Sequence, residues 1–117
     1  MKKKIYNPYD ETYKDMWNTV QEARDRLRGA VRKVILRKGV IDLYPTGPDQ
    51  DKAIKDCEEA KHSLLCAIGY YDGRMQELKE YFSSHYDKLD ECHSWHPTRM
   101  STSHEIVELA YEQTIRG

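Results

Sequence analysis

Thiol and imidazole groups gather in the last third of the sequence, where they could bind a metal. Cys92, His93 and His96 are close neighbours, and His85 precedes them by about one heptad. A thiolate and neutral imidazoles are good zinc ligands. The spacing lacks the paired Cys-x-x-Cys pattern of strong zinc motifs, and Cys92 and His85 also fit an apolar helical seam. We therefore expect no metal site and no cofactor.

A second spacing suggests nucleic-acid chemistry. Arg99 and His104 match the Arg-x4-His spacing of the helical HEPN ribonucleases, in which the arginine holds a phosphate and the histidine acts as general acid or base. Residues 100–103 read as a loop and a helix cap, whereas the family places this motif within a helix. We keep a HEPN-like ribonuclease as an alternative, but we expect no enzyme activity and assign no catalytic residue.

A third feature is a row of basic residues along the outer face expected for the first helix. The row is local, because the whole chain carries 19 basic and 20 acidic residues and a net charge of -1. That balance argues against duplex nucleic acid as a partner, whereas a local patch suits a small ligand with a few phosphates. The basic residues are Lys2, Lys3, Lys4, Arg24, Arg26, Arg28, Arg32, Lys33, Arg37 and Lys38.

Aromatic residues accompany this row and could stack on bases. Four of them, Tyr6, Tyr9, Tyr13 and Trp17, precede the arginines. Tyr13 and Trp17 fit the apolar stripe of a helix equally well, in which case they belong to the core. The residue types alone leave both interpretations open.

The composition is typical of long amphipathic helices. The 117 residues have the length of one domain, and 38% are hydrophobic against 33% charged. No run approaches the roughly 18 apolar residues that cross a bilayer, so we expect no membrane partner. Three cysteines without a framework spacing are typical of reduced thiols, which favours the cytoplasm.

A 3.6-residue hydrophobic period predicts two long helices. The first covers about residues 10–39, with the Asp10 carboxylate as its amino-terminal cap. In the second, apolar residues from Ile54 to Cys92 recur at spacings of three and four, which predicts a seam of about five heptads. This helix would reach roughly 44 residues and extend beyond its partner, with a kink possible at Gly69 or Gly73.

A capping box opens the last helix, because Thr102 is followed three residues later by Glu105. The predicted fold class is therefore all-α. A single helical domain, 1–117, contains a long antiparallel hairpin over 9–93 with an extended second helix, and a short carboxyl-terminal helix over 102–116. The seam left exposed by the longer helix predicts a homo-oligomer.

Two stretches resemble the helical hairpin of phage cyclic-nucleotide sponges of the anti-CBASS and anti-Thoeris type. The second helix of that family often reads S-L-A-L-T-K-L-E-E-A-x-x-W-A-x-x-A-I. Residues 51–60 and 67–68 match it without a gap at the Ala and the following aliphatic residue, at Glu-Glu-Ala and at Ala-Ile. The resemblance covers about residues 6–68.

The amino-terminal half of the family often reads Y-x-x-L-[ST]-x-x-E-x-x-x-M-N-x-I-K. Matching offsets are occupied by Tyr6, Asp10 as the cap, Asn18 and Val20. Trp17 stands in place of Met, and Gln21 stands in place of the final Lys. In the family, the Tyr and that Lys clasp the cyclic dinucleotide by stacking and by a contact to phosphate. The resemblance implies ligand-binding roles for Tyr6 and Gln21, and for Arg24 and Arg28 as replacements for the lost charge.

The function that this resemblance implies is non-enzymatic sequestration of a cyclic di- or trinucleotide immune signal, in the cytoplasm of the phage's host. A protein–protein inhibitor or adaptor of a defence system, similar in kind to an anti-CRISPR, is the first alternative. It would act through the long face of the second helix. The HEPN-like ribonuclease is the second alternative.

Overall fold

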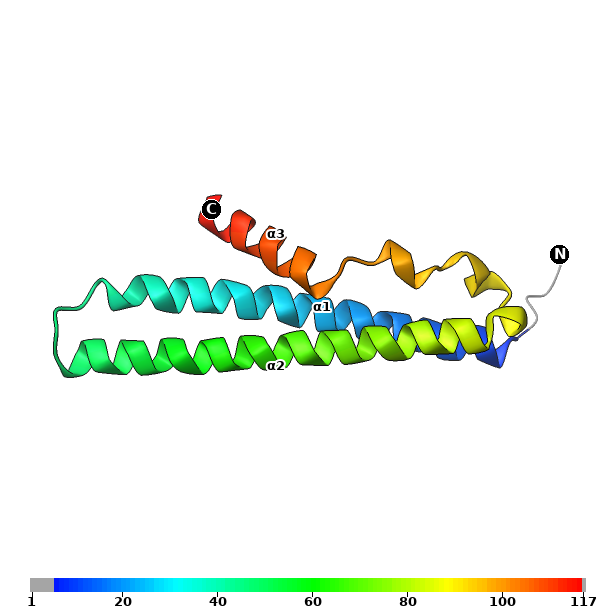
Figure 1. Cartoon of the computed structure of the whole chain (residues 1–117), viewed down its shortest axis with the longest axis horizontal. Coiled ribbons are helices and arrows are strands. Elements are labelled where there is room, and N and C mark those ends of the chain that lie inside the picture. Colours follow the sequence, from blue (N-terminus) through cyan, green and yellow to red (C-terminus); the bar gives the residue numbers. More distant parts are fainter. Residues whose placement is uncertain (1–5, 117) are drawn as a thin grey trace.

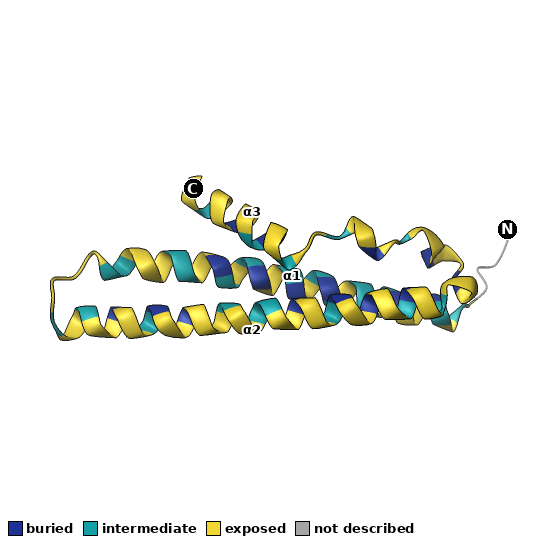
Figure 2. Ribbon diagram, viewed as in Figure 1, coloured by how far each residue is buried: buried dark blue, intermediate teal, exposed yellow. Residues whose placement is uncertain are grey.

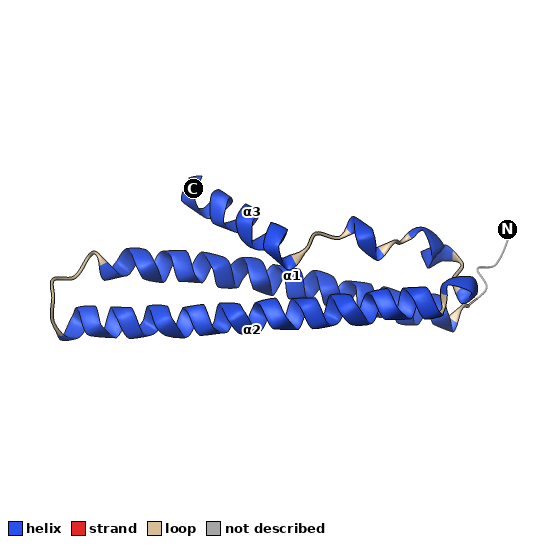
Figure 3. Cartoon of the chain, in the orientation of Figure 1, coloured by secondary structure: helices blue, strands red, loops and turns tan. Residues whose placement is uncertain are grey.

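The computed structural model describes residues 6–116, which form a rod of three α-helices and three short 3₁₀-helices (Figure 1). The long helices α1 (Pro8–Ile41) and α2 (Pro48–Ser84) lie antiparallel, and α3 (Ser103–Arg116) packs against α1. Figure 3 shows no strand in this part of the chain. The principal extents are 68 × 24 × 22 Å. The predicted all-α hairpin with a short carboxyl-terminal helix is confirmed.

The prediction that Asp10 caps the first helix is wrong. Asn7 is the cap, because its side-chain oxygen accepts hydrogen bonds from the backbone N–H of Tyr9 at 2.9 Å and of Asp10 at 3.3 Å. Pro8 occupies the first turn, where its fixed φ and missing N–H cost nothing. The helix then continues two residues beyond Gly39, to Ile41.

Asp10 instead binds a segment 80 residues further along the chain. Its buried carboxylate accepts hydrogen bonds from the backbone N–H of Asp90 at 3.0 Å, Glu91 at 3.1 Å and Cys92 at 3.3 Å. The Cys92 thiol donates to the Asp10 carbonyl oxygen at 3.6 Å. Asp10 therefore holds the chain against α1 after α2 has ended.

The prediction of an extended second helix that reaches residue 93 is also wrong. α2 ends at Ser84, and η1 (Tyr86–Lys88), η2 (Glu91–Ser94) and η3 (Pro97–Arg99) follow. Leu89 and Cys92 are nevertheless buried, as their place in the seam predicts. Their side chains reach the core along an irregular path, which the Asp10 carboxylate supports by accepting N–H groups that a continued helix would have paired internally.

The segment between α2 and α3, residues 85–102, runs back along the hairpin toward α3 (Figure 1), and we call it the returning segment. Two buried tyrosines hold it by donating hydrogen bonds to its backbone: Tyr13 to the Trp95 carbonyl and Tyr71 to the Ser101 carbonyl, both at 2.5 Å. The capping box at the start of α3 is confirmed. Glu105 Oε1 accepts from the Thr102 N–H at 3.2 Å, and Thr102 Oγ1 accepts from the Glu105 N–H at 3.2 Å.

The core lies where the returning segment and α3 add a third layer to the two long helices (Figure 2). Towards the loop that joins α1 to α2, the rod is only two helices thick and apolar side chains remain exposed. Leu36 is 60% exposed and Leu43 77%, and Leu65, at the middle of α2, is 67% exposed. The core residues are Tyr13, Val20, Ala23, Leu27, Tyr71, Met75, Leu78, Phe82, Leu89, Cys92 and Ile106.

α2 is one continuous helix through Gly69 and Gly73, so neither glycine interrupts it. No helix within residues 6–116 is long and apolar enough to cross a membrane.

Candidate functional site: a basic cavity between the first helix and the returning segment

A small cavity lies between the middle of α1 and the end of the returning segment, and Tyr71 of α2 forms part of its wall. Its volume is about 190 Å³. We call it the basic cavity, since three arginines and no acidic residue line it. The lining residues are Trp17, Val20, Gln21, Arg24, Arg28, Tyr71, Arg99, Met100 and Ser101.

The spacing of the α1 residues explains why they reach one cavity. Trp17, Gln21, Arg24 and Arg28 follow one another at intervals of four, three and four, which places them on one face of a helix. The guanidinium groups of Arg24 and Arg28 are 3.5 and 3.9 Å from the same carboxylate oxygen of Asp25. Each guanidinium has five N–H donors, so this exposed pairing leaves donors for a ligand.

Arg99 adds a third arginine to the lining of the basic cavity, from η3 rather than from α1. It ends η3, which the buried ring of Pro97 and the hydrogen bond from Tyr71 to Ser101 hold in place. Three arginines around one small cavity favour an anion with planar, multiply accepting oxygens, and phosphate is the common biological example.

Arg24 contributes a guanidinium that is only partly exposed. Its Nε atom is buried and has no hydrogen-bond acceptor among residues 6–116. Burial raises the pKa of the Tyr71 hydroxyl, and the positive charge of Arg24 acts in the opposite direction. A buried donor without an acceptor is rare in proteins, and an anion held by the same guanidinium would offset part of its cost.

The structure brings together three of the four predicted ligand-binding residues. Gln21, Arg24 and Arg28 all line the basic cavity. Tyr6 does not, because it precedes α1 and is 74% exposed. Thirteen residues of helix, about 20 Å at 1.5 Å per residue, separate the start of α1 from Gln21.

No sequence pattern indicated that Met100 and Ser101 belong to this site, and Arg99 was singled out only by the ribonuclease spacing. Their position depends on the path of the returning segment, which has no local signature. His104, the other residue of that spacing, is exposed, and its Nε2 is 2.9 Å from a carboxylate oxygen of Glu108. It does not line the basic cavity.

The other aromatic candidates have different surroundings. Tyr13 is fully buried, so it belongs to the core and its ring is not available for stacking on a ligand. The Lys88 ammonium lies 5.2 Å from the centre of the Tyr9 ring. Trp17 packs its ring 5.3 Å from that of Trp95, and of these three aromatics it alone also lines the basic cavity.

The remaining basic residues do not form a second cluster at this site. The Arg26 guanidinium lies 5.6 Å from the centre of the Tyr70 ring, and Arg37 pairs with Asp56 at 3.9 Å. Lys2, Lys3 and Lys4 lie outside the described residues.

The thiol and imidazole groups near the end of α2 contribute to packing. Burial raises the pKa of the Cys92 thiol to about 11, and the Asp10 carboxylate reinforces this shift. The rings of His85, His93 and His96 each lie against an aromatic ring, at 4.1, 4.0 and 5.0 Å between centres. Across residues 6–116, no three metal-ligating side chains gather into a group that could hold an ion.

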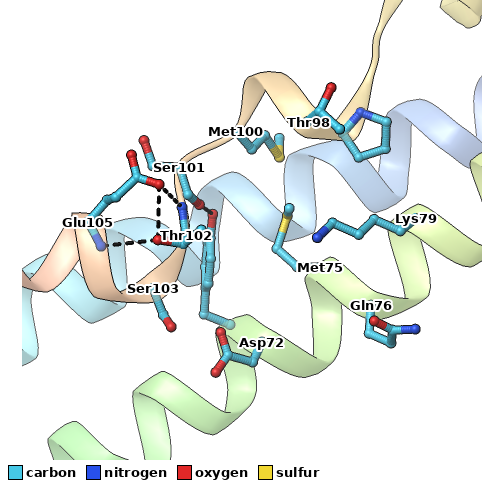
Figure 4. Close-up of a pocket in the computed structure, with 12 residues that line it drawn as sticks. Asp72, Met75, Gln76, Lys79, Thr98, Met100, Ser101, Thr102, Ser103 and Glu105 are labelled. Carbon is cyan, nitrogen blue, oxygen red and sulfur yellow. Dashed lines mark hydrogen bonds between the residues drawn. The ribbon is translucent and has the colours of Figure 1, made fainter.

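A larger cavity of about 450 Å³ lies on the other side of the same wall, between α2 and residues 97–105 (Figure 4). We call it the outer cavity. It shares Tyr71, Met100 and Ser101 with the basic cavity. Its other lining residues are Asp72, Met75, Gln76, Lys79, Pro97, Thr98, Thr102, Ser103 and Glu105.

Comparisons with known proteins add no assignment to this geometry. No protein-family model matches the chain, and neither a curated protein nor a solved structure matches it.

Proposed function

We propose that this protein binds cyclic oligonucleotide signals without cleaving them, and that it thereby withholds them from an immune effector in the host cytoplasm. The observation that carries the proposal is the basic cavity, which Gln21, Arg24 and Arg28 line together with Arg99. The first three were assigned to ligand binding from the sequence, and their common location supports that assignment.

The chemistry of the cavity suits a phosphodiester. Arg24, Arg28 and Arg99 can donate paired N–H groups to phosphate oxygens, which are strong charge-assisted hydrogen bonds. The Gln21 amide both donates and accepts, so it can bind a base edge or a ribose hydroxyl. The Trp17 ring supplies an apolar surface. Arg24 and Arg28 thus replace the charge that the family places at the position of Gln21.

The size of the basic cavity points to a site shared between chains. Whole small-molecule sites usually measure about 300–1,000 Å³, whereas this cavity measures about 190 Å³. A cyclic dinucleotide would therefore extend beyond it, and a second copy of the chain would cover the remainder. In such a homo-oligomer, Tyr6 of one copy stacks on a base held by its neighbour.

A capture-and-release experiment tests binding without turnover. The protein is incubated with cyclic di-GMP, the unbound ligand is removed by filtration, and the protein is then denatured by heat. We expect the filtrate to be depleted of ligand and the denatured sample to return it intact, because sequestration needs no bond to break. Linear or hydrolysed products in the released fraction would contradict the proposal and favour an enzyme.

The protein–protein inhibitor remains the first alternative, and the exposed apolar residues of the hairpin favour it. Leu36, Leu43 and Leu65 are each at least 60% exposed, and such side chains can dock against a partner. This alternative predicts a protein that ignores nucleotides and co-purifies with a protein target. The HEPN-like ribonuclease predicts RNA cleavage that is lost in His104→Ala.

A further inference from the structure

Two oppositely charged side chains of α2 line the outer cavity. Asp72 and Lys79 are seven residues apart, so they lie on the same helix face about 10.5 Å apart along the axis. Figure 4 shows the Lys79 ammonium directed toward the two methionines, with the Asp72 carboxylate at the opposite end of the cavity. Within residues 6–116, neither group has a hydrogen-bond or ion-pair partner.

The space between these charges has apolar walls. Met75 extends from α2 and Met100 from the end of the returning segment, and their thioethers face one another across the cavity (Figure 4). Thioethers make favourable contacts with aromatic rings and adapt to their shape. The Pro97 and Tyr71 rings add further apolar surface. Asp72 and Lys79 thus flank a cavity whose apolar lining suits a flat aromatic ring.

Among the nucleobases, guanine has the matching edges. Its N1–H and N2–H₂ groups donate together to a carboxylate, and its O6 and N7 atoms accept from a lysine or arginine. Adenine presents one donor beside the N1 lone pair, so a carboxylate that accepts from its amino group faces a second acceptor. The arrangement of an anion at one end and a cation at the other therefore selects guanine over adenine.

Asp72 is the carboxylate that would accept hydrogen bonds from guanine N1–H and N2–H₂. Glu105 also lines the outer cavity, but its Oε1 atom already accepts from the Thr102 N–H at 3.2 Å and from Thr102 Oγ1 at 3.0 Å. Glu105 is therefore already hydrogen-bonded within the capping box at the start of α3.

We infer that the outer cavity is a guanine-binding pocket for the ligand whose phosphate occupies the basic cavity. This inference rests on the proposed function. Tyr71, Met100 and Ser101 line both cavities, so the two cavities adjoin one another. A guanine nucleotide can then place its base in the outer cavity and its phosphate in the basic cavity.

Calorimetric titration with cyclic di-GMP and cyclic di-AMP tests the inference. We expect cyclic di-GMP to bind at least about tenfold more tightly, the discrimination that one paired base contact provides. Asp72→Asn should weaken cyclic di-GMP binding by about tenfold and leave cyclic di-AMP binding nearly unchanged. Asp87→Asn is the matched control, because Asp87 is exposed on η1 and does not line the cavity. Both substitutions are at exposed positions and should leave the melting temperature unchanged.

The outcomes separate this inference from the proposed function. Equal binding of the two ligands, or an Asp72→Asn variant that binds cyclic di-GMP as the parent does, would overturn the guanine pocket and leave the sponge in place. Binding of neither ligand, nor of any other cyclic nucleotide, would overturn the proposed function and the guanine pocket with it.

Discussion

Replacing Asp10 by alanine should lower the free energy of unfolding by about 3 kcal/mol, since it removes the acceptor of three backbone N–H groups. Asp90, Glu91 and Cys92 would lose their partner together, and part of the returning segment would separate from α1. Thermal and urea denaturation, followed by circular dichroism, measure the loss. Asp15→Ala, on an exposed position of the same helix, is the control and should change stability by less than about 0.5 kcal/mol.

The same hydrogen bonds predict how stability depends on pH. Burial acts to raise the pKa of the Asp10 carboxyl, but the three N–H donors outweigh it and the pKa lies below its usual value of 3.8. The ionised carboxylate therefore stabilises the fold above about pH 4, and this contribution is lost as the pH falls through the lowered pKa.

Asp10→Asn isolates this contribution. We expect its melting temperature to fall less than that of the parent between pH 5 and pH 2. A variant with the parent's acid sensitivity would show that other carboxylates dominate.

Replacing Arg24 and Arg28 together by glutamine should weaken cyclic-nucleotide binding by about a hundredfold or more. Each guanidinium contributes a charge-assisted hydrogen bond to phosphate, of about 1.5–3 kcal/mol, and every 1.4 kcal/mol is about a factor of ten in affinity. Fold stability should change little, because both side chains are more than one-third exposed. Isothermal titration of the parent and of the double variant, at the same salt concentration, measures the difference.

Arg32→Gln provides the matched control for charge alone. Arg32 lies one turn beyond Arg28 on α1, is exposed and does not line the basic cavity. Its replacement should change the affinity by less than about threefold, the scale of an exposed charge in salt. If Arg32→Gln weakened binding as much as either arginine of the cavity, the interaction would follow net charge rather than the site.

The hydrophobic pattern was sufficient to predict the hairpin because each long helix carries its own periodic signal. It also predicted correctly that Leu89 and Cys92 are buried, but it placed them on a continued helix. The path of the returning segment depends on the Asp10 carboxylate, which accepts from the backbone N–H groups of residues 90–92. These positions are about 80 residues apart in the sequence. Asp10 follows Pro8 by two positions, where an acidic residue is typical of a helix cap. The local sequence therefore did not predict that Asp10 binds residues 90–92.

Part of the candidate site was predictable from the sequence, and part depends on contacts between distant residues. Gln21, Arg24 and Arg28 share one face of one helix, which the sequence shows directly. Arg99 and Met100 reach the basic cavity because Tyr71 donates to the Ser101 carbonyl, an interaction with no local signature. Tyr6 was assigned through the family resemblance. In a single chain it precedes α1, and about 20 Å of helix separates the start of α1 from Gln21.

One structural element thus connects stability and the proposed binding. The returning segment supplies Arg99 to the basic cavity and Met100 to both cavities, and it is held to α1 by Asp10 and Tyr13. Substitutions at either anchor should therefore reduce ligand binding as well as the free energy of unfolding.

Calorimetric titration of the parent protein with cyclic di- and trinucleotides, cyclic ADP-ribose signals and their linear analogues tests whether the protein binds a cyclic nucleotide. The account predicts saturable binding of at least one cyclic nucleotide and far weaker binding of its linear form. It also predicts fewer ligands than chains, because one ligand is enclosed by more than one copy. The absence of binding across the whole panel would contradict the account and leave a protein partner as the remaining ligand to seek.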